Sequence, residues 1–166
     1  MIILGLDPGT ATTGYGVVRS VAGRIQGICY GTVNTPAHTP MSKRLSTIYD
    51  DIGALIEHYQ PDEVAIERLY FGRNITTAMT VSQARGVLLL QAEQHGLAIG
   101  EYTPMQVKQA LVGNGHAEKK QVQYMVQKFL GLTAVPKPDD AADALAIAIC
   151  HAHCCRTGRL RRGQRL

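Results

Sequence analysis

The sequence predicts an α/β domain in which helices flank a mixed central β-sheet. Its first third reads as short strands separated by glycine-containing turns, and its remainder alternates helical with strand-like apolar patterns. The chain has 166 residues, of which 45% are hydrophobic. This length and composition suit one globular domain with a sizeable core and leave no room for a second domain of similar size.

Five segments read as strands. Segments 1–6, 14–20 and 24–33 are joined by glycine turns, and their spacing predicts an antiparallel meander. Segments 63–67 and 97–102 are short apolar runs that lie between helical patterns. Three antiparallel strands followed by alternating helices and strands predict the mixed sheet.

Five segments read as helices. From Met41, apolar residues recur every three or four positions until Pro61 ends the pattern. A second helix spans about 75–95, and a third begins with a capping box at Thr103, with Pro at the first helical position. The sequence predicts two more helices, at 118–130 and from about residue 139.

Basic residues are concentrated at the C-terminal end. The net charge is +4, but residues 156–166 contain five arginines and no acid, so the remainder holds 12 basic and 13 acidic side chains. We therefore expect a domain at 1–155 and a basic, flexible tail at 156–166. Such a tail can hold a phosphate backbone, or it can be a disordered, solubilising terminus.

The cysteines and the hydropathy indicate a soluble, cytoplasmic protein. Three of the four cysteines lie within the last seventeen residues, which is no disulfide framework, so we expect reduced thiols. The segment CHAHCC at 150–155 lacks the two separated ligand pairs typical of zinc sites, and we interpret it as a helix end with incidental Cys and His. No run approaches ~18 consecutive apolar residues, so we expect no membrane span.

Several acids lie where apolar residues are expected. Asp7 ends the apolar run IILGL, and Glu67 ends VAI. Asp7 is followed by Pro and Gly, so ordinary turn chemistry is one interpretation and a metal or phosphate site is the other. Asp143 is the one non-apolar residue from 141 to 150, and burying an unpaired carboxylate is costly. Asp140 precedes it by three residues and so shares its helical face.

These four acids together predict a metal centre. If Asp7, Glu67, Asp140 and Asp143 converge, they cannot all stay ionised without a cation. Oxygen ligands favour Mg²⁺ or Mn²⁺, and two such ions suit phosphoryl transfer. For Asp140, the alternative is that it complements the helix dipole beside a capping Asp139.

In order and spacing, the chain closely resembles the bacterial RuvC family of Holliday-junction resolvases. The resemblance covers residues 2–153 and rests on LGLDPGTATTGYGVV, VAIERLYFGRN, SQARGVLLL, TPMQVKQALVGNGHAEKKQVQ and DDAADALAIAICH. It implies an RNase H-like fold and a homodimer that makes paired, metal-dependent nicks in four-way DNA junctions. It places the four catalytic, metal-binding acids at Asp7, Glu67, Asp140 and Asp143, with two Mg²⁺ ions for which Mn²⁺ can substitute.

The resemblance also implies DNA-binding residues and partners. It assigns junction contacts to the loop residues Tyr70, Phe71 and Arg73, where an aromatic ring can stack on an unpaired base. It assigns DNA contacts near the cleaved phosphate to Lys108 and Lys119. We expect His116 to be a lesser candidate for proton transfer. In this family a RuvA–RuvB branch-migration complex acts alongside the resolvase.

Three other functions remain open at this point. DPGTATTGYG also resembles the first phosphate loop of actin-like kinases, but those proteins need a second such loop, which this chain lacks. A non-catalytic junction-binding module would not need the four acids. An RNase H-like nuclease acting on another substrate, such as an RNA–DNA hybrid, would use the same acids.

Overall fold

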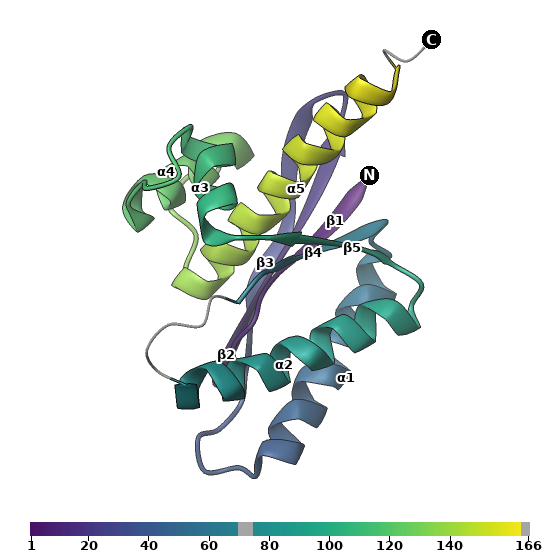
Figure 1. The fold of residues 1–166 in the computed structure, drawn as a ribbon, viewed down its shortest axis with the longest axis vertical. Helices are drawn as coiled ribbons and strands as arrows, with labels where there is room; N and C mark the ends of the chain where they lie inside the picture. Colours follow the sequence, from purple (N-terminus) through teal and green to yellow (C-terminus); the bar gives the residue numbers. More distant parts are fainter. Residues whose placement is uncertain (70–74, 164–166) are drawn as a thin grey trace.

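The structure, a computed structural model, describes the backbone of residues 1–69 and 75–163 and the side chains of residues 1–69 and 78–155. Within these ranges, the chain forms a five-stranded sheet of order β3-β2-β1-β4-β5 (Figure 1). The strands are β1 (Ile2–Asp7), β2 (Thr12–Val21), β3 (Arg24–Asn34), β4 (Glu63–Glu67) and β5 (Ala98–Tyr102).

The direction of each strand follows from its connection. Strands β1, β2 and β3 pair antiparallel through short turns, as the glycine spacing predicts. Strand β4 pairs parallel with both β1 and β5. One helix forms the crossover from β4 to β5, and the chain passes through β2, β3 and another helix between β1 and β4. The predicted α/β class, the meander and the mixed sheet are therefore confirmed.

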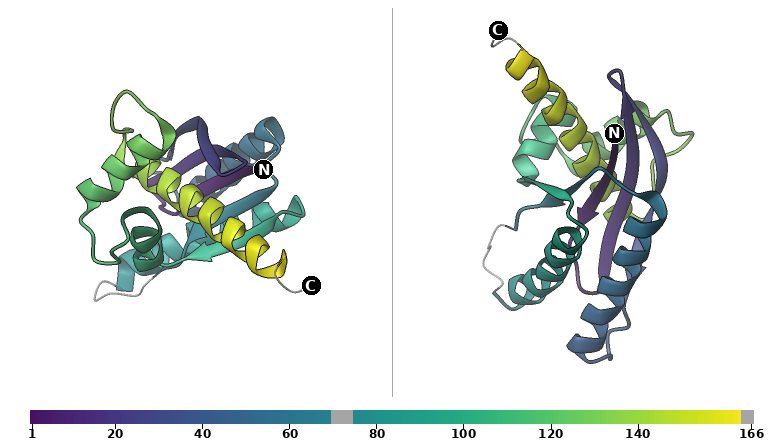
Figure 2. Two further views of the ribbon diagram at one scale, coloured as in Figure 1. Left: turned by 90° about the horizontal axis from the view of Figure 1, so that it is seen from above. Right: turned by 90° about the vertical axis from the view of Figure 1, so that its right-hand side faces the viewer.

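Helices cover both faces of the sheet (Figure 2). Helices α1 (Met41–Tyr59) and α2 (Ile75–Gln94) cover one face, and α3 (Pro104–Val112), α4 (Lys119–Leu130) and α5 (Asp139–Gly163) cover the other. Because side chains alternate along a strand, Ile3 joins the core under α5, while its neighbour Leu4 joins the core under α1 and α2. The domain thus has two cores, one on each face of the sheet.

Helix α5 packs unusually close to the sheet because three glycines lie beneath it. A Cβ atom at Gly5 or Gly14 would overlap main-chain atoms of α5, at Ala144 and Asp140 respectively, and one at Gly16 would collide with Leu145. Gly5 and Gly16 are paired across β1 and β2. The first half of α5 therefore rests on sheet backbone rather than on side chains.

The helix predicted from about residue 139 begins at Asp139 and continues through Gly163, past the expected tail boundary at residue 155. Asp139 is thus the first helical residue rather than the cap. The tail's role in binding DNA stays a prediction. Within the described ranges, none of the helices is both long and apolar enough to cross a membrane.

Candidate active site

Two of the predicted acids lie side by side at one edge of the sheet. Leu6 of β1 is in register with Ile66 of the parallel strand β4, so the next residues, Asp7 and Glu67, end neighbouring strands at the same edge. Carboxyl ends of parallel strands are the usual location of binding sites in open α/β sheets. The parallel strands β1 and β4 therefore both end in a carboxylate at the same edge of the sheet.

The first two turns of α5 carry the other two acids to this edge. Gly14 of β2 is paired with Asp7, and the absence of a side chain at Gly14 lets the backbone of Asp140 lie directly against it. Asp143 follows one turn later and lines a pocket with Asp7 and Glu67. The four predicted acids thus lie in one region, although Asp140 is not among the residues that line the pocket.

The pocket has a volume of about 240 Å³ and combines acids with lysines. Its polar lining consists of Asp7, Glu67, Asp143, Lys108 and Lys119. Apolar side chains of α3, α4 and α5 complete its wall. A partly apolar wall lowers the local dielectric, which strengthens interactions between the charged groups and an anionic substrate.

The two lysines come from the helices that flank α5. The Nζ atom of Lys119, at the start of α4, lies 2.8 Å from Asp143 and 3.6 Å from Asp139. Partial burial lowers the pKa of Lys119. Its hydrogen bond to Asp143 and the charges of the neighbouring acids together raise the pKa by more than burial lowers it, so the net shift is upward. Lys108 reaches the same pocket from α3. Both lysines that the resemblance assigns to DNA contacts therefore line the same pocket as Asp7, Glu67 and Asp143.

Burial and mutual repulsion raise the pKa values of the acids in the pocket. Burial first, and then the charges of Glu67, Asp143 and Asp140, raise the pKa of Asp7 to about 8, despite the opposing charge of Lys119. Burial and the charge of Asp143 raise the pKa of Glu67 to about 6. Burial also raises the pKa of Asp143, against the lowering effect of Lys119. The three carboxylates of the pocket outnumber its two lysines, Lys108 and Lys119, which is typical of a cation site.

The donor set of the pocket fits hard divalent cations. Its candidate ligands are carboxylates, the ligands that Mg²⁺ and Mn²⁺ accept readily. The carboxylate oxygens of Asp7, Glu67 and Asp143 do not all lie within 4.8 Å of one another. Among the described residues, a different group of three side chains meets this criterion. These carboxylates would be the protein ligands of such a cation.

One positioning residue was missed by the sequence analysis. Arg85 of α2 donates from Nε to the main-chain oxygen of Glu67 at 3.1 Å and forms an ion pair with Glu101 of β5. It therefore holds the end of β4 where Glu67 enters the pocket. The signal was available, because Arg85 is the one charged residue from 75 to 92.

If the chain has the nuclease activity that the resemblance implies, replacing Arg85 with Ala is expected to slow DNA cleavage and to leave DNA binding largely intact. Loss of the hydrogen bond to the main chain at Glu67 leaves a partly buried carbonyl without this donor. This costs about 1–3 kcal/mol of free energy in holding the end of β4 in place. Single-turnover cleavage and metal-free DNA binding measure the two effects separately. Arg85→Lys is the matched control, because it keeps the charge but not the forked geometry. Equal losses in cleavage and binding would contradict a positioning role.

Other predicted residues lie outside this pocket or outside the described residues. His116 is exposed in the loop before α4 and does not line the pocket. Tyr70, Phe71 and Arg73 fall outside the residues whose side chains the structure describes. Asp139 accepts a hydrogen bond from Lys137 at 2.8 Å. This contact, together with Gln123 and Lys119, lowers the pKa of Asp139.

Comparisons with known proteins support the resemblance. A family model described as crossover junction endodeoxyribonuclease RuvC matches residues 3–151. The chain is similar to the crossover junction endodeoxyribonucleases RuvC of Syntrophomonas wolfei (60% identity, 92% of this chain, 89% of that protein) and Heliobacterium modesticaldum (58%, 92% and 94%).

A solved structure agrees with this. Thermus thermophilus RuvC in complex with a Holliday junction substrate matches with a TM-score of 0.91 and 38% identity, over 95% of this chain and 96% of that one. The expected RNase H-like α/β fold is thereby confirmed.

Proposed function

The chain belongs to the RuvC family of crossover junction endodeoxyribonucleases, and from this we propose that it resolves four-way (Holliday) junctions in the cytoplasm by symmetric paired nicks. One observation carries the assignment of its active site. Asp7 and Glu67 end neighbouring parallel strands and face Asp143 in a pocket that also holds two lysines. This combination of acids and lysines suits a metal-dependent attack on a phosphate.

In the proposed reaction, Asp7, Glu67, Asp140 and Asp143 would hold two Mg²⁺ ions. When bound, such ions activate a water molecule and stabilise the negative charge of the phosphate. Water adds to phosphorus, the bond from phosphorus to the 3′ oxygen breaks, and that oxygen takes up a proton. The products are a 5′-phosphate and a 3′-hydroxyl.

The two lysines have separate positions in this scheme. Lys119, whose ammonium is hydrogen-bonded to Asp143, is placed to bind a phosphate oxygen close to the metals. Lys108 lies on the α3 wall of the pocket and is placed to bind the DNA backbone. Each contributes a point charge rather than base recognition, so their contacts are independent of sequence.

The paired nicks require two active sites. We infer a homodimer, because the described part of the chain brings the predicted acids together in one place, while a junction must be cut on two strands. Tyr70, Phe71 and Arg73 follow Glu67 by three to six positions in the sequence, so we propose that they contact the junction. The arginines of 156–166 supply additional backbone contacts, and a RuvA–RuvB complex is the proposed partner in the cell.

Nicking assays on matched substrates test this function. We expect Mg²⁺-dependent cutting of a synthetic four-way junction, in symmetric positions on two strands, and loss of cutting when the metal is chelated. Linear duplex and an RNA–DNA hybrid of the same sequence are the controls. Equal cutting of the hybrid would assign the chain to another RNase H-like activity, and metal-dependent binding without cutting would make it a junction-binding module.

A further inference from the structure

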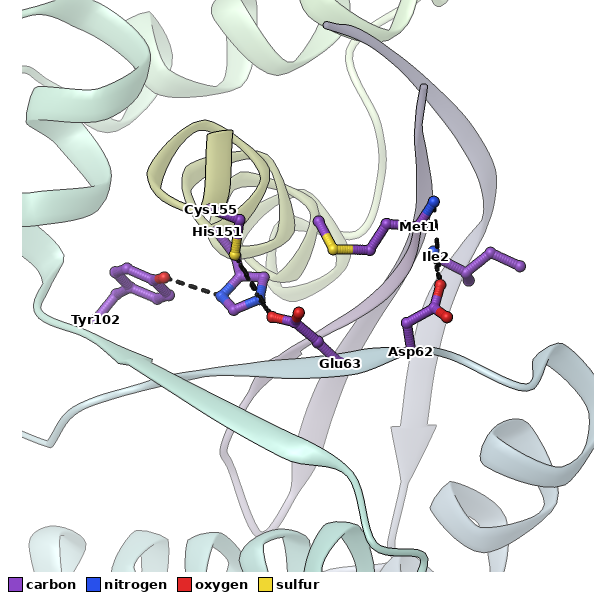
Figure 3. Close-up of polar contacts among 7 residues, drawn as sticks. All are labelled: Met1, Ile2, Asp62, Glu63, Tyr102, His151 and Cys155. Carbon is purple, nitrogen blue, oxygen red and sulfur yellow. Dashed lines mark hydrogen bonds and ion pairs between the residues drawn. The ribbon is translucent and has the colours of Figure 1, made fainter. Parts of the chain in front are cut away.

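A second cluster of polar side chains lies between the first residue of β4 and the middle of α5, away from the acidic pocket (Figure 3). Glu63 begins β4, and His151 and Cys155 are one turn apart on the face of α5 that covers it. The Nε2 atom of His151 lies 2.6 Å from Oε2 of Glu63. The Sγ atom of Cys155 lies 3.4 Å from each of these two atoms.

The histidine is oriented by a second partner. His151 is buried, with 5% of its side chain exposed, and its Nδ1 atom lies 2.8 Å from the hydroxyl of Tyr102 on β5. A Cβ atom at Gly100, the position two residues earlier on β5, would overlap the imidazole ring. The sheet therefore leaves room for this ring and fixes its rotation. Histidine metal ligands are typically held in this way through the second ring nitrogen.

The separations resemble those of a tetrahedral metal site. With ordinary zinc bond lengths, sulfur, nitrogen and oxygen ligands lie roughly 3.3–3.6 Å from one another. Two of the three separations already have this value, at 3.4 Å each. The third, from Glu63 to His151, must widen by roughly 0.7 Å when a metal replaces the proton between them. No other group in the described part of the chain brings three such ligand atoms within 4.8 Å.

We propose that Glu63, His151 and Cys155 form a binding site for one divalent transition-metal ion of the zinc class. A thiolate, an imidazole and a carboxylate together favour such an ion over Mg²⁺. On binding, the thiol releases one proton to solvent. The ring proton moves from Nε2 to Nδ1, so the Tyr102 hydroxyl changes from hydrogen-bond donor to acceptor.

This site is separate from the proposed active site. His151 follows Asp143 by eight positions on α5, which is about 12 Å along the helix axis. A metal here would link β4 to the part of α5 that leads into the arginine-rich segment, residues 156–166. The sequence interpretation of CHAHCC as incidental missed this because the third ligand, Glu63, is 88 residues from His151 in the chain.

Cobalt substitution tests the proposal on the full chain, stripped of metal under reducing conditions. We expect one Co²⁺ per chain to give thiolate-to-cobalt charge-transfer absorption, which one equivalent of Zn²⁺ removes. Cys155→Ser should abolish this absorption and weaken Zn²⁺ binding by at least about 10-fold, measured by competition with a chromophoric chelator. Tyr102→Phe should weaken it by about 10–100-fold.

Two controls make the result specific. Cys154→Ser changes the exposed neighbouring thiol and should leave the absorption intact. Asp143→Asn alters the acidic pocket and should also leave it intact, so failure of the proposed nuclease function would not affect this test. If Cys155→Ser does not fold, Glu63→Gln provides the affinity measurement. Absence of the absorption in the unmodified protein, or its persistence in Cys155→Ser, would overturn the proposal.

Discussion

Replacing Asp7 with Asn is expected to abolish junction cleavage and, at the same time, to stabilise the metal-free protein. The pKa of Asp7 is raised more than that of Glu67, and the charges of all three other predicted acids contribute to its shift. Loss of a metal-binding carboxylate removes several kcal/mol of transition-state stabilisation, which corresponds to a rate loss of about 1,000-fold or more. The same substitution removes an acid that the folded, metal-free chain must keep protonated near neutral pH, which costs stability.

The sign of the stability effect follows from the pKa of Asp7. Its pKa is about 8 in the folded, metal-free protein and about 4 in the unfolded chain, so the folded state binds the proton more tightly. Stability from this group is full below pH ~4 and is lost as the pH rises toward 8. Asp7→Asn should therefore gain on the order of 2 kcal/mol near neutral pH and little at pH ~4.

Thermal unfolding with and without Mg²⁺ measures this effect. In chelator at neutral pH, the midpoint of Asp7→Asn should rise by roughly 4–8 °C, since each kcal/mol is worth about 2–4 °C in a domain of this size. Added Mg²⁺ should raise the midpoint of the unmodified protein and not that of the variant. Asp50→Asn, an exposed acid on α1, is the control and should change neither property. A variant that still cuts the junction would refute the assignment of Asp7.

Replacing Gly14 with Ala is expected to destabilise the domain and to slow cleavage together. The new Cβ atom would overlap the main chain at Asp140, so the first turn of α5 must move away from β2. Overpacking of this kind costs about 1–3 kcal/mol. The displaced turn takes Asp140 and Asp143 away from Asp7, so cutting falls even at temperatures where the variant is folded.

Gly86→Ala is the matched control for this substitution. A Cβ atom at Gly86 meets nothing within 4 Å, and its position within α2 makes Ala the better helix former by about 0.5–1 kcal/mol. Urea unfolding should therefore shift in opposite directions for the two variants, with cleavage reduced in Gly14→Ala alone. Normal cleavage by folded Gly14→Ala would show that the contact with Asp140 does not position the acids.

Local patterns in the sequence were sufficient to predict the elements and most of the pocket. Apolar periodicity and glycine turns predicted the meander and the helices because each depends on residues close together in the chain. The acids were detectable because Asp7 and Glu67 end apolar strands and Asp143 interrupts an apolar helix. The resemblance added Lys108 and Lys119, and both lysines line the pocket.

Features that depend on strand register or on backbone contact were not predictable in this way. The neighbouring positions of Asp7 and Glu67 depend on the parallel pairing of β1 with β4, which nothing local specifies. Arg85 is recognisable as a lone charge in its helix, but it holds the end of β4 through a main-chain oxygen, so nothing local in the sequence shows what it positions. The contact between Gly14 and Asp140 joins residues 126 positions apart, and a glycine in a strand does not indicate what it touches.

The glycines beneath α5 make the geometry of the active site largely independent of the overall stability of the protein. Side chains that repack after a substitution can shift a helix, but peptide groups in direct contact at Gly5 and Gly14 leave little freedom for such shifts. The core under α1 and α2 lies on the far face of the sheet. Natural variation there can alter how long the molecule survives in the cell without changing where it cuts.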